Sequence, residues 1–117
     1  MNASPQRIIL EMGTGNDLYG QDYTKAAKRA VQDAIHHSSL LLFRSLDLDP
    51  GEMEIELTIA AQEPELVDLS EVAKELPYGK VTPLAKSGGL NVALDDERTT
   101  VIVNAGIVVR YPLTRPA

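Results

Sequence analysis

The spacing of apolar residues in the first third of the chain predicts a strand followed by a helix. From Arg7 to Met12, apolar side chains stand at every second position, which is the period of a half-buried strand. From Asp22 to Ser38, apolar residues instead recur at helical spacing, and Asp22 has a side chain suited to cap the helix. This apolar stripe comprises Tyr23, Ala26, Ala27, Ala30, Val31, Ala34 and Ile35. Because most of these residues are small, we expect the helix to lie close to a sheet.

The middle of the chain predicts a second strand and a shorter helix. Met53 to Ala60 alternates strictly, with large apolar side chains on one face and mainly acidic or polar ones on the other. Asp68 and Glu71 have the spacing of a capping box and precede a short apolar stripe at helical spacing. Pro77 ends that helix.

The last part of the chain predicts one bent strand and one long final strand. Lys80 to Leu94 is interrupted by Ser87-Gly88-Gly89, which is typical of a bulge or bend. Asp95 to Arg98 is a hairpin loop, and the final strand is Thr99 to Tyr111. The order β-α-β-α-β-β predicts a single α+β domain over residues 1–117, with helices on one face of a small, mixed, four-stranded sheet.

The final strand predicts a homo-oligomer because it is apolar on both of its faces. Its apolar residues are Val101, Ile102, Val103, Ala105, Ile107, Val108 and Val109. Two modest helices cover only one side of the sheet, and leaving four such side chains in water would forgo roughly 1.5–3 kcal/mol each. We therefore expect the other face to lie in an interface with another copy, for which a second copy is the commonest answer; the sequence does not set the number of copies, and a trimer or a higher oligomer stays open. The alternative is that the segment from Leu40 to Leu48 covers it.

The composition narrows the function classes. The formal net charge of −6 argues against nucleic-acid partners, which are bound through an excess of Lys and Arg. The absence of Cys excludes disulfides, thiolate metal sites and Cys nucleophiles, and it suits a reducing compartment. No apolar run is long enough to span a membrane, so we expect a cytoplasmic protein. His36 and His37 are neighbours and lack metal-ligand spacing on a helix, so no metal site is expected.

A glycine-rich segment between the first strand and the helix is the first candidate site. Gly13 and Gly15 stand where phosphate loops stand, although the third glycine of a dinucleotide fingerprint and the lysine of a P-loop are missing. Lys25 and Arg29 lie one turn apart near the helix start, which predicts a site for a small anion. The alternative is that both cations pair with nearby acids. The candidate ligand-binding residues are Gly13, Gly15, Asp17, Thr24, Lys25, Arg29, Gly88, Gly89 and Asn104.

Ser87 is the second candidate. A serine in a glycine-rich bend, beside backbone N–H groups, could act as a nucleophile next to an oxyanion hole. Lys86 points to the opposite face, so Lys25 or a lysine from another subunit would have to activate it. The alternative is a plain bulge. Asn104, in the apolar final strand, is expected to be buried and therefore hydrogen-bonded, either ordering an interface or contacting a ligand.

Several motifs together resemble a family of short bacterial conserved hypothetical proteins, first catalogued from a Listeria genome. They are Glu11-Met12-Gly13-Thr14-Gly15-Asn16-Asp17, Gly20-Gln21-Asp22, Thr24-Lys25-Ala26, Arg29-Ala30, Asp33-Ala34-Ile35, Pro64-Glu65, Val67-Asp68, Leu76-Pro77-Tyr78-Gly79, Gly88-Gly89-Leu90 and Val103-Asn104-Ala105. The resemblance covers nearly the whole chain, and it implies no settled activity.

Ser87-Gly88-Gly89 also resembles, more distantly, the serine motif of the ring-opening amidohydrolases, the cyanuric acid hydrolase and barbiturase group. Those enzymes look like three fused copies of a domain of this size, each with a serine and a lysine. The resemblance implies that this chain would build its site by trimerising, with Lys25 in the lysine's place.

Three functions stay open from the sequence. The first is a homo-oligomer that binds a small anionic or amide-containing metabolite near residues 13–20 and the helix start. The second is a cyclic-amide hydrolase that uses Ser87 and Lys25 at a subunit boundary. The third is a structural oligomer without a ligand. None of them calls for a cofactor.

Overall fold

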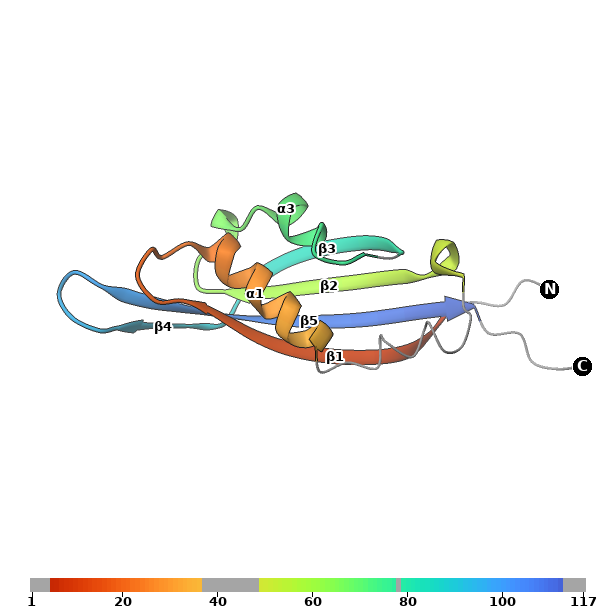
Figure 1. The fold of residues 1–117 in the computed structure, drawn as a ribbon, viewed down its shortest axis with the longest axis horizontal. Coiled ribbons are helices and arrows are strands. Elements are labelled where there is room, and N and C mark those ends of the chain that lie inside the picture. Colours follow the sequence, from red (N-terminus) through yellow and green to blue (C-terminus); the bar gives the residue numbers. More distant parts are fainter. Residues whose placement is uncertain (1–4, 37–48, 78, 113–117) are drawn as a thin grey trace, which may run out of the picture.

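Strands and helices alternate along the chain as the sequence pattern predicts, and they form two layers (Figure 1). The computed structural model describes residues 5–36, 49–77 and 79–112. In that part of the chain, five strands form one mixed sheet, and two α-helices lie on one of its faces. The elements are β1 (Pro5–Asp17), α1 (Tyr23–His36), the 3₁₀ turn η2 (Pro50–Glu52), β2 (Glu54–Ala61), the 3₁₀ turn η3 (Pro64–Leu66), α3 (Leu69–Ala73), β3 (Lys80–Ser87), β4 (Leu90–Ala93) and β5 (Thr99–Pro112).

The long strand β5 organises the sheet. The order of the strands across the sheet is β1-β5-β2-β3, and the short strand β4 also pairs with β5, outside this order. β1 runs antiparallel to β5 along nearly the whole of it, whereas β2 and β4 share the other edge of β5 in succession. β3 runs parallel to β2. β5 therefore connects the main sheet to a hairpin that it forms with β4.

The core lies between α1 and the sheet. The predicted stripe of α1 is buried from Tyr23 to Ala34, with Ile35 half-buried, and the predicted cap is confirmed because Asp22 Oδ1 accepts a hydrogen bond of 3.0 Å from Lys25 N. In β2, Ile55, Leu57 and Ile59 are buried on the side of the sheet that carries the helices. Burial of this aliphatic surface is the main force that holds the two layers together.

The prediction of a loop at Gly13 and Gly15 is wrong, because both glycines lie inside the extended strand β1. They allow the close approach of α1. A Cβ on Gly13 would meet Ala34 N at 2.5 Å, and one on Gly15 would lie inside contact distance of Ala26 O and Ala30 N. The same small residues that suggest a phosphate loop in the sequence thus form the floor on which the alanines of α1 rest.

The predicted bent strand is two strands, which is why the sheet has five strands and not four in the described part of the chain. Gly89 has a φ of +64°, a conformation that favours glycine, and it turns the chain from β3 to β4. A Cβ on Gly88 would meet the Ala60 side chain at 2.7 Å. Before the bend the chain pairs with β2, and after it the chain pairs with β5.

The two faces of β5 differ, as the sequence predicts for a sheet with helices on one side. Its odd-numbered residues from Val101 to Val109 are buried on the side of the sheet that carries the helices (Figure 1). Its even-numbered residues from Thr100 to Arg110, with their neighbours in register on the other strands, form what we call the open face. No helix among the described residues covers the open face. Residues 40–48, the alternative cover, lie outside the described residues.

Candidate functional site

The open face has a hollow of about 450 Å³ near its centre. Gly106 forms its floor, and a Cβ there would meet nothing within 4 Å. The hollow is lined by Met12, Gly13, Thr14, Asp33, Thr58, Ala60, Asn104, Ala105 and Gly106. Its volume lies within the range of small-molecule sites, about 300–1,000 Å³. A flat sheet acquires this depression because a strand residue without a side chain stands between longer ones.

The polar part of the hollow consists of the neutral side chains of Asn104, Thr14 and Thr58 and of the carboxylate of Asp33, whose Oδ2 accepts a hydrogen bond of 2.9 Å from Thr14 N. Asn104 Nδ2 donates to Thr14 Oγ1 at 3.1 Å. Asn104 is exposed, so the expectation of a buried amide is wrong: its position on β5 faces away from the helices. The bond leaves the amide oxygen of Asn104 as an acceptor and the hydroxyl proton of Thr14 as a donor for a ligand, with Thr58 beside them. Such a set matches an amide or a hydroxyl group.

The predicted anion site at the start of α1 is occupied by the protein's own carboxylates. Arg29 Nη1 donates to Asn16 O at 2.7 Å and lies 3.8 Å from Asp17 Oδ1. The other oxygen of Asp17, a buried side chain, accepts from Asp22 N at 2.9 Å. These contacts favour the alternative in which Arg29 pairs with an acid. Lys25 makes no polar side-chain contact within the described residues.

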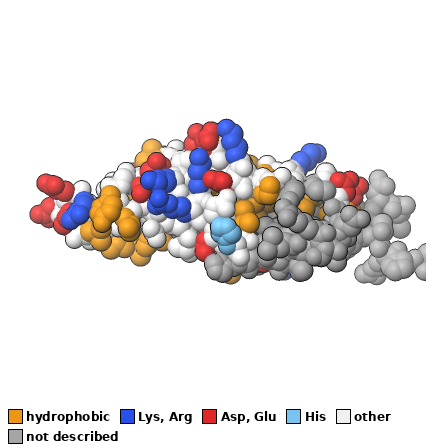
Figure 2. Space-filling view, in the orientation of Figure 1, with side chains coloured by type: hydrophobic (Ala, Val, Ile, Leu, Met, Phe, Trp, Pro, Cys, Tyr) orange, Lys and Arg blue, Asp and Glu red, His pale blue; other side chains and the backbone are white. Residues whose placement is uncertain are grey.

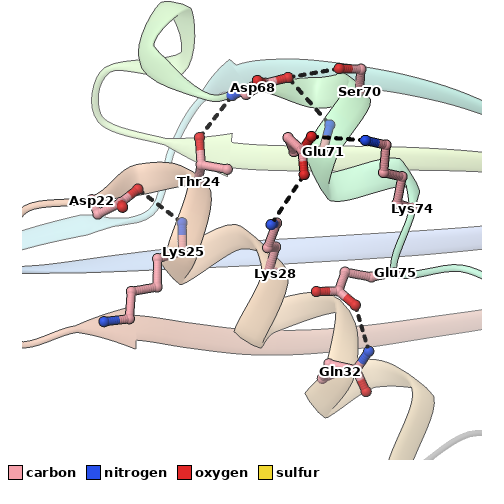
Figure 3. A network of polar contacts seen from close by, with 10 residues as sticks. All are labelled: Asp22, Thr24, Lys25, Lys28, Gln32, Asp68, Ser70, Glu71, Lys74 and Glu75. Carbon is pink, nitrogen blue, oxygen red and sulfur yellow. Dashed lines mark hydrogen bonds and ion pairs between the residues drawn. The ribbon is translucent and has the colours of Figure 1, made fainter.

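Thr24 belongs to a polar seam that joins α1 to α3 (Figure 3). Its hydroxyl accepts from Asp68 N at 2.8 Å, and Lys28 Nζ lies 3.4 Å from Glu71 Oε2. Asp68 caps α3 as predicted, but the reciprocal half of the capping box is absent, because Glu71 binds Lys28 and Lys74. Lys74, first, and then Lys28 lower the pKa of Glu71 below its ordinary value. Thr24 therefore has a structural contact, and a ligand role for it stays a prediction.

The structure places Ser87 at the end of β3, exposed, with no hydrogen bond from its hydroxyl to any described residue. The bend that follows is held by Gln62, whose Nε2 donates to Gly88 O at 3.0 Å and to Gly89 O at 3.3 Å. Lys86 lies in register with Ala60, on the open face, and so points away from Ser87. Because no described lysine of the same chain is hydrogen-bonded to Ser87, its catalytic role stays a prediction.

Two consecutive hydrogen bonds join β4, α1 and the loop after β2, and no sequence pattern predicts them. Asn91 Nδ2 donates to Tyr23 Oη at 2.7 Å, and that hydroxyl donates to Glu63 Oε2 at 3.2 Å. The three residues are far apart in the chain, so no spacing could reveal them. Burial raises the pKa of Tyr23 above its ordinary value; the hydrogen bond from Asn91 opposes this shift, and Glu63 adds to it.

The raised pKa of Tyr23 predicts an alkaline loss of stability. In the unfolded chain this tyrosine ionises near pH 10, whereas the folded protein holds the proton to higher pH. The stabilisation is therefore complete below pH 10 and is lost as the pH rises through the folded pKa. We expect the free energy of unfolding, measured with urea between about pH 8 and 11.5, to fall more steeply in the native protein than in Tyr23→Phe. Parallel curves would contradict this assignment.

The described residues contain neither a candidate metal site nor a candidate membrane-spanning helix. No group of three or more His, Asp or Glu side chains in them could hold a metal ion. His36 ends α1 as an exposed side chain, and His37 lies outside the described residues. Among the described helices, none is long and apolar enough to cross a bilayer.

The fold and the hollow define a two-layer α+β domain with a small-molecule-sized depression on its uncovered sheet face. Residues 7–109 match a family described as "Conserved hypothetical protein (Lin0512_fam)", and the chain belongs to this family. It is also similar to the crystal structure of an FtsZ-like protein of unknown function from Nostoc punctiforme PCC 73102. That protein is 36% identical, with a TM-score of 0.79 over 95% of this chain and 99% of the other. No curated protein matches the chain.

These comparisons confirm the predicted family and the α+β fold. They do not confirm the resemblance to the ring-opening amidohydrolases. Neither the description of the family nor that of the similar protein names a ligand or a reaction, so the site residues carry the functional argument.

Proposed function

We propose that the protein is a cytoplasmic homo-oligomer that binds a small, neutral metabolite with amide or hydroxyl groups in the hollow of the open face. One observation carries this proposal. The hollow, with Asn104 and Thr14 in its wall, lies among exposed apolar side chains that a lone chain leaves in water, of which Met12 is 75% exposed. A small polar site ringed by apolar surface is what a ligand site at a subunit boundary requires.

The size of the open face supports assembly with a second copy. Leu10, Met12 and Leu84 are all more than half exposed on it. Strands of 8 to 14 residues, spaced about 4.8 Å apart, give this face an area on the order of 600–800 Å². Each partner in a standard protein–protein interface contributes about 800 Å². A second copy of the same face would cover the apolar side chains and close the hollow.

The chemistry of the hollow favours a neutral ligand over an anion. The side chains of Asn104, Thr14 and Thr58 offer hydrogen bonds without charge, and the charged group in the described lining, Asp33, is an acid that repels anions. Of the two cations of the predicted anion site, Arg29 is engaged by Asp17 and by a backbone carbonyl, and Lys25 is not among the residues that line the hollow. A net charge of −6 also disfavours anionic ligands at long range. Of the two metabolite classes that the sequence suggests, the amide-containing class therefore fits better.

A thermal-shift panel of cyclic amides, linear amides and polyols tests the binding proposal. A ligand at about ten times its Kd stabilises the protein by about 1.4 kcal/mol, which raises Tm by about 5 °C. We expect an amide to produce this shift in the native protein, and we expect the shift to disappear in Asn104→Ala and in Gly106→Leu, which fills the hollow.

The matched control is Asn16→Ala. Asn16 is an exposed asparagine on the same face that does not line the hollow, so this variant should keep the full shift. Two results would overturn the proposal: no compound at about 1 mM raises Tm, or Asn104→Ala responds as strongly as the native protein does.

A further inference from the structure

The hairpin of β4 and the start of β5, residues 90–102, projects beyond the helices and beyond β2 and β3 (Figure 1). We call it the arm. All four residues of β4 are exposed, and its backbone pairs only with β5 in the described part of the chain. Leu90, Val92 and Leu94 are 54%, 39% and 52% exposed. An isolated two-stranded ribbon is marginally stable in water, so further contacts are needed to stabilise this exposed apolar ribbon.

The tip of the arm is tightly built. Asp95 Oδ1 accepts hydrogen bonds from the backbone N of Glu97 and of Arg98, at 2.9 and 2.8 Å. The other carboxylate oxygen binds the Arg98 side chain at 2.6 and 2.8 Å. The Arg98 guanidinium also lies 5.6 Å from the centroid of the Tyr19 ring. Hydrophobic side chains gather beside these charges at this end of the molecule (Figure 2).

The base of the arm is anchored to the rest of the chain. Asn91 is tied to α1 by its hydrogen bond to Tyr23, and Thr100 Oγ1 donates to Leu18 O at 3.3 Å. Gln62 holds the carbonyls of the bend just before β4. A ribbon fixed at both ends loses little conformational entropy when it binds a partner. This preorganisation is what a docking element requires.

We propose that the arm docks on the open face of a second copy, in a two-fold contact centred on Asn104, where it covers that copy's hollow. The proposal rests on the homo-oligomeric function proposed above. Leu90 and Val92 lie on the open-face side of β5, so their apolar surface continues that of the open face. When two such sheets pack with their β5 strands antiparallel, Leu90, in register with Ile102, lies over Thr58 of the other copy, which lines its hollow.

The same register brings apolar side chains together along both edges of the contact. Leu84 is 56% exposed and pairs with Thr58 in the sheet, so it lies beside Leu90 of the other copy. Along β1, Leu10 is in register with Val108 and comes over Leu18 of the other copy, which directly follows β1 and is 47% exposed. Apolar surface therefore meets apolar surface on either side of Asn104.

Charge complementarity supports the same arrangement. The tip carries Asp95, Asp96 and Glu97, of which only Asp95 is paired with a cation in the described structure. In the two-fold contact the tip approaches the far end of the other copy's open face, where Arg110 is paired with Glu56 at 3.2 Å and Arg7 makes no ion pair with a described residue. The unpaired acids of the tip thus approach Arg7 twice, once at each end of the interface. The occupant is therefore a second copy of this chain.

Cysteine cross-linking tests the register, because the native chain contains no Cys. In the double variant Leu90→Cys/Thr58→Cys, the two cysteines of one chain stand four residues apart along β5, on strands that do not pair. That separation of about 13 Å is too long for an internal cross-link by a methylene-bridged bis-methanethiosulfonate, whereas packed sheets about 10 Å apart bring the thiols of two copies within its reach. We expect this reagent to give a covalent dimer of twice 12.7 kDa. Its yield should be at least about ten times that of either single variant.

Two control variants separate failure of this inference from failure of the proposed function. Leu66→Cys/Thr58→Cys places one cysteine on the helix side, where Leu66 is 57% exposed, and should give no dimer above the single-variant level. Asn104→Cys lies on the proposed two-fold axis and should cross-link to itself. Cross-linking through Asn104→Cys but not through Leu90→Cys/Thr58→Cys would overturn the docking of the arm and leave the open-face oligomer standing. Absence of both cross-links would contradict the oligomer itself.

Discussion

Gly15→Ala is expected to destabilise the protein by about 3 kcal/mol or more, a large share of a domain's stability. The added methyl group would lie inside contact distance of two backbone atoms of α1, Ala26 O and Ala30 N, and also 2.8 Å from the carbonyl carbon of Arg29. Backbone atoms cannot swing aside as a flexible side chain does. The helix would have to move away from β1, and the buried alanine stripe would lose its packing. Urea unfolding monitored by circular dichroism measures the loss.

Gly106→Ala is the matched control, because Gly106 is also a strand glycine but a Cβ on it meets nothing within 4 Å. We expect its free energy of unfolding to stay within about 0.5 kcal/mol of the native value or to rise, since alanine loses less entropy than glycine in a strand. If Gly15→Ala were as stable as Gly106→Ala, the close contact between β1 and α1 would not exist in solution.

Leu84→Asp is expected to dissociate the oligomer without unfolding the chain. Leu84 lies on the open face, in register with Thr58, and is 56% exposed in the single chain. Adding a carboxylate there costs little in a monomer. In the proposed interface, two of these carboxylates would be removed from water beside Leu90, without cations to pair with them, so we expect Kd to rise at least about a hundred-fold. Sedimentation velocity as a function of concentration measures Kd.

Leu66→Asp makes the same substitution on the other side of the molecule. Leu66 is 57% exposed, nearly the same as Leu84, but it lies in η3 on the helix side. The Leu66→Asp variant should therefore leave both the Kd of the oligomer and the fold unchanged. Equal dissociation by the two variants would mean that the open face is not the specific interface.

The elements with strong local patterns could be predicted from the sequence. The alanine stripe of α1 and the alternation of β2 depend on neighbours within one element, and both are found where the pattern places them. The cap at Asp22 also depends only on local geometry. β5 has no such alternation in its sequence, because it is apolar on both faces, so the pattern alone does not tell which face the helices cover.

The site could not be predicted to the same extent, because its features depend on pairs that are distant in sequence. Gly13 and Gly15 fit a phosphate loop and a strand beneath a helix equally well, and only their contacts with α1 distinguish the two. The hollow arises from the register of Gly106 against Met12 and Thr58, which no local spacing encodes. The pattern of β5 singles out Asn104, but nothing in the sequence points to its partner Thr14.

The change from one bent strand to two strands has a similar origin. Ser87-Gly88-Gly89 predicts a bend, and the bend is present. Which strand each half then joins depends on the close approach of Gly88 to Ala60 and of Gly89 to Ile102 O, both distant in sequence. Long-range backbone approach of this kind decides strand number while leaving the local pattern unchanged.

Sedimentation equilibrium of the unmodified protein at micromolar concentration is the most direct test of this account. If a second copy covers the open face, the mass will be a whole multiple of 12.7 kDa, greater than one. A mass of 12.7 kDa at every concentration up to about 100 µM would show that the open face stays in water, and the proposed interface and the ligand site that it closes would both be contradicted.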